Sequence, residues 1–485
     1  MEVIILYRQK LDVFIRIYDE VGYIINKGTH KSRITDKSGA IFLKAISRQP
    51  KDLTEIVNEI AEAFVTVDLD TLKKDVVEFL DILEKDGFLV SGNTLEELDK
   101  NDIRFSYSIL GNEVSTENFS QDIFRTNQDI EDKLSKYFEN TPILTQFHVE
   151  LTSRCNERCV HCYIPHENKD TDIAPNLYYS LLEQCKEMGV LGITLSGGEP
   201  MSHPNFIDFL HKAKEYDFSV NVLTNLTLLT DEIIGELKSI SLSGIQTSLY
   251  SMQPEIHDSI TKVPGSFFKT RNAILKLIKN DIPLQISCPI TRLNKDSFVD
   301  VTKWAAKYNV PTVTDYIMMA RFDHTTSNLE YRLTFEEIEN IIRSNININL
   351  EYRRKIVKAD FARELKRDIS EDHLCKACTS SISMNSHGMI YPCAGWQNYD
   401  CGNLKDTSLY EIWNHSPRVL YIRNLRKKDF FDCVKCPNRH FCVICMARNA
   451  NEDPNGNPLK VSGYSCKVAE INREIALAIH NESNQ

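Results

Sequence analysis

The sequence predicts an α/β protein built on a partial (β/α)6 barrel of the TIM type. A winged-helix-like α+β domain precedes the barrel, and a cysteine-rich domain follows it. Three observations carry this prediction. Strand and helix patterns alternate through the middle of the chain, which is typical of a parallel sheet with helical crossovers. Strand patterns and then three helical patterns come before this region. Nine of the 14 cysteines fall between residues 375 and 466.

The length and composition of the chain indicate several cytoplasmic domains. With 485 residues the chain exceeds what one hydrophobic core organises. We divide it into a winged-helix-like domain (1–92), a polar linker (93–140), the barrel (141–345) and a cysteine-rich domain with a closing helix (346–485). The net charge is −11. The sequence shows no basic face of the kind that a nucleic-acid-binding protein usually presents. No apolar run approaches the ~20 residues that span a membrane, and the N-terminal apolar patch is too short for a signal peptide.

The first 92 residues contain strand patterns followed by three helical patterns, and this order predicts the winged-helix-like unit. Strands are expected at 11–18, 22–26 and 32–35, helices at 38–46, 53–64 and 69–85, and a short strand near residue 90. The last helix carries five acidic residues against three lysines, which is a poor face for binding phosphate. DNA binding would need a basic recognition helix, so this helix argues against it. The alternative function of the domain is the capture of a peptide at the edge of the small sheet.

The barrel prediction rests on six strand patterns separated by amphipathic helices. The expected strands are 147–151, 192–195, 219–223, 244–249, 284–290 and 312–317. In such a fold, the reactive groups gather at the C-terminal ends of the strands.

A cysteine triplet follows the first barrel strand directly. Cys155, Cys159 and Cys162 have the spacing C-x3-C-x2-C. Structural zinc sites need four ligands, and iron–sulfur clusters are also normally held by four thiolates. Three thiolates on one loop therefore predict a cluster with one iron open to a substrate or cofactor.

A glycine-rich turn ends the second barrel strand. It reads Gly197-Gly198-Glu199-Pro200, and glycines there let the backbone approach a ligand closely. The Glu199 carboxylate can accept hydrogen bonds from an amino group.

Together these two motifs resemble the radical S-adenosylmethionine superfamily. The resemblance implies that the three cysteines ligate a 4Fe-4S cluster, whose open iron is chelated by S-adenosylmethionine. It implies that Gly197, Gly198 and Glu199 hold the amino group of the cofactor, and that Pro200 belongs to the same cofactor-binding turn. Further cofactor contacts implied by the resemblance are Tyr163, Thr224, Asn225 and Ser248. The family usually has Gly after the Asn, where Leu226 stands here. The implied chemistry is reductive cleavage to a 5′-deoxyadenosyl radical.

The second cysteine region contains eight cysteines that could fill two metal sites of four ligands each. From spacing alone, paired zinc ribbons and further clusters both remain open. The pattern resembles the SPASM extension of radical enzymes, although only two residues separate Cys442 from Cys445, where the family more often has three. The resemblance implies two auxiliary 4Fe-4S clusters, one held by Cys375, Cys378, Cys393 and Cys445, and the other by Cys433, Cys436, Cys442 and Cys466. We expect Cys185 and Cys288 in the core and Cys401 as a bystander.

The order of elements at the N-terminus resembles the peptide recognition element of ribosomal peptide maturases. This resemblance implies a precursor peptide whose leader is bound by the first domain, and an external electron donor such as flavodoxin or ferredoxin. The expected reaction is a cross-link in that peptide, in the first place a cysteine thioether. A carbon–carbon cross-link is the second enzyme hypothesis. An iron–sulfur DNA-binding sensor is the alternative from another class.

Overall fold

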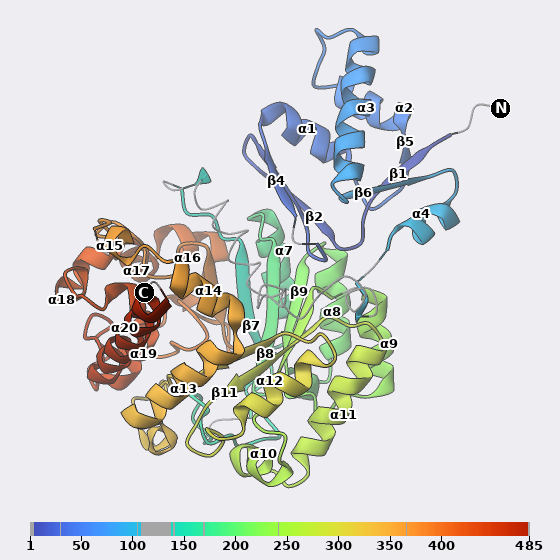
Figure 1. Ribbon diagram of the computed structural model, residues 1–485. Helices are drawn as coiled ribbons and strands as arrows, with labels where there is room; N and C mark the ends of the chain where they lie inside the picture. Colours follow the sequence, from blue (N-terminus) through green and yellow to red (C-terminus); the bar gives the residue numbers. More distant parts are fainter. Residues whose placement is uncertain are drawn as a thin grey trace.

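The computed structural model describes residues 4–29, 31–103, 105–107, 137–138, 141–167, 170–240, 242–364 and 366–483. Figure 1 shows three parts: a blue N-terminal domain, a green and yellow barrel below it, and an orange and red C-terminal domain beside the barrel. In this part of the chain, two three-stranded sheets belong to the N-terminal domain, and one nine-stranded sheet runs through the other two parts.

The N-terminal domain contains the winged-helix-like elements that the sequence predicts. Its strands are β1 (Leu6–Gln9), β2 (Val13–Tyr18), β3 (Val21–Asn26), β4 (Ser32–Thr35), β5 (Lys51–Asp52) and β6 (Leu89–Gly92). Its helices are α1 (Lys37–Ala45), α2 (Leu53–Ala61) and α3 (Leu69–Lys85). The sheets have the strand orders β5-β1-β6 and β2-β3-β4. Each of the three helices begins after an aspartate that caps its N-terminus. Apolar residues recur at helical spacing, so each helix places one apolar face on the core.

Strand β1 was missed from the sequence because its apolar residues do not alternate with polar ones. Its partner β6 lies more than 80 residues away and pairs with it antiparallel, Leu6 opposite Gly92. Local pattern does not reveal such a distant partner. The expected linker contains one described helix, α4 (Leu95–Asn101), while residues 108–136 lie outside the described part.

The barrel has the six parallel strands that the sequence predicts. They run in the spatial order β12-β11-β10-β9-β8-β7. Their bounds are β7 (Gln146–Thr152), β8 (Gly192–Gly197), β9 (Ser219–Leu223), β10 (Gly244–Ser248), β11 (Leu284–Pro289) and β12 (Thr312–Asp315). The helices between and after them are α7 (Pro175–Glu187), α8 (Phe206–Glu215), α9 (Asp231–Ile240), α10 (Pro254–Thr261), α11 (Ser266–Lys279) and α12 (Phe298–Ala306). Strands β7 to β11 bury β-branched or aromatic residues. Because all six strands are parallel, their carboxyl ends open on one side of the sheet.

The C-terminal domain extends the barrel sheet instead of folding beside it. Strand β13 (Ser381–Met384) pairs parallel with β7, and β14 (Met389–Tyr391) and β15 (Gly402–Asn403) follow antiparallel. The helical elements that follow the six barrel strands in the chain are η3 (Ser327–Tyr331), α13 (Phe335–Ile348), α14 (Leu350–Lys358), α15 (Phe361–Glu364), α16 (Leu409–His415), α17 (Pro417–Asn424), η4 (Lys427–Asp429), α18 (Phe431–Val434), η5 (Arg439–Phe441), α19 (Met446–Glu452) and α20 (Gly463–Ser483). This pairing brings the second cysteine region to the side of the barrel that carries the first.

The N-terminal domain is attached to the barrel by hydrogen bonds and an ion-pair cluster. Arg16 donates to the Val190 carbonyl at 3.0 Å and to the Asp217 carbonyl at 2.6 Å. The Asp217 carboxylate also accepts from Arg48 at 2.6 Å. The Tyr18 hydroxyl donates to Gly189 at 3.1 Å. The contact therefore joins β2 to the loops before β8 and β9, at the end of the barrel opposite to the strands' carboxyl ends.

No helix in the described ranges combines the length and the apolar character needed to cross a membrane.

Candidate active site and auxiliary metal centres

A cavity of about 470 Å³ opens where the six barrel strands end. Residues from all six strand ends or the segments just after them contribute to its wall. Its lining includes Cys155, Glu157, Cys159, His161, Cys162, Tyr163, Gly197, Gly198, Thr224, Asn225, Gln246, Ser248, Tyr250, Ser287, Asp315 and Arg448. The first cysteine motif and most of the expected cofactor contacts thus come together in one space.

The cysteine loop leaves β7 and is fixed by backbone hydrogen bonds to the end of α10. Arg158 and Val160 donate to the carbonyls of Thr261 and Ile260 at 2.9 and 3.0 Å. Burial raises the pKa of the Cys159 thiol, and the nearby Glu157, Cys162 and Cys155 raise it further. The three thiols therefore lie close enough to repel one another as thiolates, so a bound cation or metal cluster would stabilise them.

The three thiols of the cysteine loop all line one cavity. Three thiolates around one space suit an iron–sulfur cluster, and they leave one iron open.

Two glycines let the end of β8 approach the cysteine loop. Gly197 has a φ of 134°, and a Cβ atom there would lie 2.2 Å from the Thr152 carbonyl oxygen. A Cβ on Gly198 would lie 2.2 Å from the Arg154 carbonyl oxygen. Because any side chain would separate the two segments, both positions require glycine. The two glycines line the cavity, as the sequence predicts.

Glu199 lies behind the cavity wall and not on it. Its side chain is fully buried. Its carboxylate accepts hydrogen bonds from the Thr224 hydroxyl at 2.7 Å, the Asn225 backbone N–H at 2.7 Å and the Met201 N–H at 3.0 Å. Burial raises the pKa of Glu199 to about 6, against the effect of these bonds. The protein's own donors engage both oxygens, and Glu199 is not among the residues that line the cavity, so its contact with the cofactor stays a prediction. Pro200 is likewise buried and begins η2 (Pro200–Ser202).

The remaining expected contacts lie on the wall of the cavity. Tyr163, Thr224, Asn225 and Ser248 all line it. The Asn225 side-chain amide donates to Asn156 at 2.9 Å, which links the end of β9 to the cysteine loop. Leu226 has a φ of 62°, in the left-handed region that favours glycine. This backbone geometry gives a physical reason for the family's preference for glycine at that position.

Three of the lining residues that were not found from the sequence carry reactive or charged groups close to the cysteine loop or from the C-terminal domain. The Tyr250 hydroxyl lies 3.8 Å from the Cys159 sulfur and 3.4 Å from Nε2 of His161. Its place two residues after Ser248 at a strand end was the available signal. Glu157 lies inside the cysteine motif, and burial raises its pKa to about 7. Arg448 comes from α19 in the C-terminal domain, and nothing in the local sequence connects it to the barrel.

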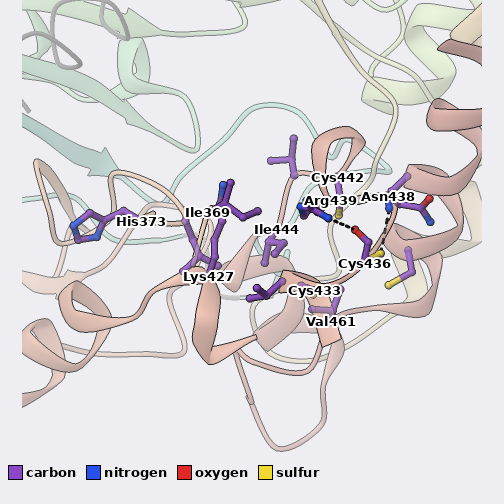
Figure 2. A pocket seen from close by; sticks show the side chains of 15 residues that line it. Ile369, His373, Lys427, Cys433, Cys436, Asn438, Arg439, Cys442, Ile444 and Val461 are labelled. Atoms are coloured by element: carbon purple, nitrogen blue, oxygen red, sulfur yellow. Dashed lines mark hydrogen bonds between the residues drawn. The ribbon is translucent and has the colours of Figure 1, made fainter. Parts of the chain in front are cut away.

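The second auxiliary set of cysteines surrounds its own cavity. Cys433, Cys436, Cys442 and Cys466 all line a space of about 240 Å³, and the first three are labelled in Figure 2. The Asn438 backbone N–H donates to the Cys436 sulfur at 3.4 Å, as drawn in the figure. Burial raises the pKa of Cys442 to about 11, and the charges of the other three thiols raise it as well. Four thiols around one cavity fit a four-thiolate cluster.

The first auxiliary set is brought together less completely. Burial raises the pKa of Cys393, and Cys445 and Cys375 raise it further, so these three lie near one another. Cys378 is buried, and its pKa is raised first by a hydrogen bond with Cys401. Cys401, expected as a bystander, therefore lies next to an expected ligand. Cys185 and Cys288 are fully buried core residues, as predicted.

Three family models match successive parts of the chain. The radical SAM superfamily model matches residues 149–305. The SPASM model, described as an iron–sulfur cluster-binding domain, matches residues 375–437. A model described as coenzyme PQQ synthesis protein D matches residues 24–89. The SPASM match decides between the two readings of the second cysteine region, in favour of iron–sulfur clusters over zinc.

Curated relatives and solved structures agree with these matches. The chain is 25% identical over 323 residues to the AdoMet-dependent heme synthase of Methanosarcina barkeri, covering 62% of this chain and 90% of that protein. It is 26% identical over 317 residues to the subtilosin biosynthesis protein AlbA of Bacillus subtilis, covering 63% and 67%. The crystal structure of Streptococcus suis SuiB bound to the precursor peptide SuiA superposes with a TM-score of 0.60 at 14% identity, covering 94% of this chain and 99% of that one. At this identity, the superposition shows a shared fold.

Proposed function

Because this chain is a radical S-adenosylmethionine enzyme with SPASM and PqqD-like domains, we propose that it modifies a ribosomally made precursor peptide. The observation that carries this proposal is the peptide-recognition type of domain fixed on the barrel of the same chain. AlbA is named for the biosynthesis of a bacteriocin, and SuiB was solved with a precursor peptide. A peptide substrate for this chain fits both likenesses.

The leader of the peptide would bind at the open edge of the small sheet. In the sheet order β2-β3-β4, β4 is a terminal strand and pairs with β3 alone among the described residues. An extended segment can add to such an edge through main-chain hydrogen bonds. The ion pairs of Asp217 with Arg16 and Arg48 would hold this edge in a constant position relative to the barrel.

The cavity residues would bind the cofactor and orient the substrate. Cys155, Cys159 and Cys162 would ligate the cluster, and Gly197 and Gly198 would admit the amino acid part of the cofactor. Tyr163, Asn225 and Ser248 would contact it from the wall, while Glu199 would hold Thr224 and Asn225 in place. When bound, the cofactor supplies a 5′-deoxyadenosyl radical that removes a hydrogen atom from the substrate. The protein's own groups position that hydrogen and exclude water.

The auxiliary sites would accept the electron that a cross-link releases. In a thioether, a peptide C–H and a cysteine S–H are replaced by one C–S bond. One hydrogen atom goes to the deoxyadenosyl group, the thiol releases its proton, and one electron must leave. Clusters held by Cys375, Cys378, Cys393 and Cys445, and by Cys433, Cys436, Cys442 and Cys466, would take that electron. A carbon–carbon cross-link has the same electron count and is the second possibility on this scaffold.

A haem precursor is a second candidate substrate class, because of the likeness to heme synthase. That likeness covers 62% of this chain, and it does not by itself account for the PqqD-like domain at residues 24–89. A titration with porphyrins separates the two substrate classes, since a bound porphyrin changes its visible absorption spectrum.

The test is an anaerobic assay of the reconstituted enzyme with S-adenosylmethionine, a strong reductant and a candidate peptide encoded beside its gene. We expect 5′-deoxyadenosine from the wild type and none from a Cys155→Ala/Cys159→Ala/Cys162→Ala variant. We expect the peptide to lose two hydrogens per link, and alkylation of its cysteines to fall in step if the link is a thioether. Full alkylation of a modified peptide would indicate the carbon–carbon link. Deoxyadenosine without any change in peptide mass would contradict the peptide proposal.

A further inference from the structure

The hydroxyl of Tyr250 lies against the sulfur of an expected cluster ligand. It is 3.8 Å from the Cys159 sulfur and 3.4 Å from Nε2 of His161. Tyr250 follows the end of β10 by two residues, is 4% exposed, and lines the same cavity as Cys159. Because a phenol has an ordinary pKa of about 10, its oxygen carries at neutral pH a proton that it can donate.

Both the backbone and the ring of Tyr250 hold the hydroxyl in this position. The backbone N–H donates to Nδ1 of His257 at 3.3 Å, and the carbonyl accepts from the Asn294 side-chain amide at 2.8 Å. The ring contacts that of His161 edge to face, with 5.1 Å between the ring centres, and it contacts the His257 ring at 5.3 Å. A buried side chain packed in this way has few other rotamers, so the hydroxyl stays beside Cys159.

The hydrogen bond from Tyr250 suits Cys159 as a metal ligand. As a thiol, Cys159 donates to the Glu157 carboxyl group at 3.4 Å and accepts from Tyr250. A cysteine that binds iron has lost its proton, so it can no longer donate, but it can still accept. Hydrogen bonds to an ionised acceptor are roughly twice as strong as those between neutral groups. The thiolate is therefore a better acceptor for the Tyr250 hydroxyl than an imidazole nitrogen of His161.

We propose that Tyr250 is a positioning residue that acts through Cys159, whose thiolate accepts its hydrogen bond, and that it raises the reduction potential of the cluster on the cysteine loop. A reduced cluster carries one more negative charge than an oxidised one, and hydrogen bonds to the sulfurs are among the factors that set its potential. The donor stabilises the reduced form more than the oxidised form, and no covalent bond changes. The inference rests on the ligation by Cys155, Cys159 and Cys162 proposed above, and not on the identity of the substrate.

The test is an anaerobic redox titration of the reconstituted enzyme, followed by electron paramagnetic resonance. A Cys155→Ala/Cys159→Ala/Cys162→Ala variant lacks the cluster in question, so subtraction separates its signal from those of the auxiliary sites. Tyr250→Phe removes only the hydroxyl. At the midpoint potential of the wild type, we expect its ratio of reduced to oxidised cluster to fall on the order of 10-fold, which corresponds to about 59 mV for one electron. After exchange into D₂O, the variant should also lack one deuteron coupling that the wild type shows.

A second substitution should move the potential in the opposite direction. 3-Fluorotyrosine in place of Tyr250 keeps the ring and the hydroxyl, but its phenol is a stronger acid and hence a stronger donor, so the potential should rise. A residue that only supported the loop would not give shifts of opposite sign. Tyr178→Phe is the matched control, because it removes a buried hydroxyl that donates to the Phe209 carbonyl at 3.0 Å in the barrel core. Its potential should equal that of the wild type.

Unchanged potentials in Tyr250→Phe and in the 3-fluorotyrosine protein, at equal iron content, would overturn the proposal, as would an equal shift in Tyr178→Phe. If Tyr250→Phe failed to take up iron, the 3-fluorotyrosine protein alone would decide, and an unchanged potential there would overturn the proposal. A signal that the triple cysteine variant keeps would contradict the ligation itself, and the inference with it. No peptide is present in these measurements, so failure of the proposed peptide chemistry would leave them unchanged.

Discussion

The hydroxyl of Thr224 donates a hydrogen bond of 2.7 Å to the buried carboxylate of Glu199. The second carboxylate oxygen accepts from the Asn225 backbone at the same distance. One acidic side chain after β8 thus fixes the segment after β9, two of whose residues line the cavity. We therefore expect Glu199 to act on the cofactor through these neighbours.

We expect Glu199→Gln to weaken cofactor binding without removing the cluster ligands. A glutamine side chain offers one acceptor oxygen, so either Thr224 or the Asn225 N–H loses its partner, at a cost of about 1–3 kcal/mol. The dissociation constant for S-adenosylmethionine should rise roughly 10-fold, measured by equilibrium dialysis, while the iron content stays unchanged. Glu78→Gln on the exposed face of α3 is the control. An unchanged dissociation constant would show that Glu199 does not position the wall.

Gly198→Ala should abolish the site while its control stabilises the protein. The added methyl group would lie 2.2 Å from the Arg154 carbonyl oxygen, so the cysteine loop must move away from β8. We expect a loss of cofactor binding and a lower melting temperature. Gly235→Ala in α9 meets nothing within 4 Å and should stabilise the helix by about 0.5–1 kcal/mol. Normal deoxyadenosine formation by Gly198→Ala would contradict the close approach.

The stability of the barrel should fall in acid through His257. This side chain is 1% exposed, and its Nδ1 accepts a hydrogen bond from the Tyr250 backbone N–H at 3.3 Å. Burial lowers its pKa to about 4, against a usual value near 6.5. Between these values the unfolded chain binds a proton that the folded protein does not. The contribution is therefore complete above pH ~6.5 and is lost as the pH falls towards ~4, by up to about 3 kcal/mol.

The measurement is the free energy of unfolding against pH for the wild type and His257→Asn. Asparagine keeps an acceptor near the position of Nδ1 but does not titrate. The variant should therefore lose less stability between pH ~6.5 and ~4 than the wild type does. Parallel pH curves for the two proteins would assign the acid sensitivity to other groups.

Features that neighbouring residues determine could be predicted from the sequence, whereas features that depend on distant residues could not. The barrel strands and the cysteine loop were found because alternation and spacing are written within short segments, and Gly197 and Gly198 follow the same logic. The buried position of the Glu199 carboxylate was not found, because its donors lie 25 and 26 residues further along the chain. Arg448 was missed for the same reason on a larger scale, since contacts between distant segments, such as the pairing of β13 with β7 and the hydrogen bond of Arg448 to the Ile317 carbonyl, bring the C-terminal domain to the cavity. Strand β1 needed a partner more than 80 residues away.

The position of Cys401 leads to a prediction about the first auxiliary cluster. Cys401 is 4% exposed and forms a hydrogen bond with Cys378. Cys375 and Cys445 lie close enough to Cys393 to raise the pKa of its thiol. A thiol this close to a ligand can replace it. We therefore expect Cys378→Ala to keep its iron, because Cys401 becomes the fourth ligand. The double variant Cys378→Ala/Cys401→Ala should lose about four irons per chain, the content of one cluster.

Iron and sulfide analysis and Mössbauer spectroscopy of the anaerobically reconstituted proteins test this replacement. Cys185→Ala is the control, since Cys185 lies fully buried in the barrel core and should change stability without changing iron content. Loss of about four irons from Cys378→Ala alone would mean that Cys401 cannot reach the cluster. Full iron in the double variant would mean that neither thiol is a ligand, and that Cys375, Cys393 and Cys445 hold a cluster with one iron open to a further group.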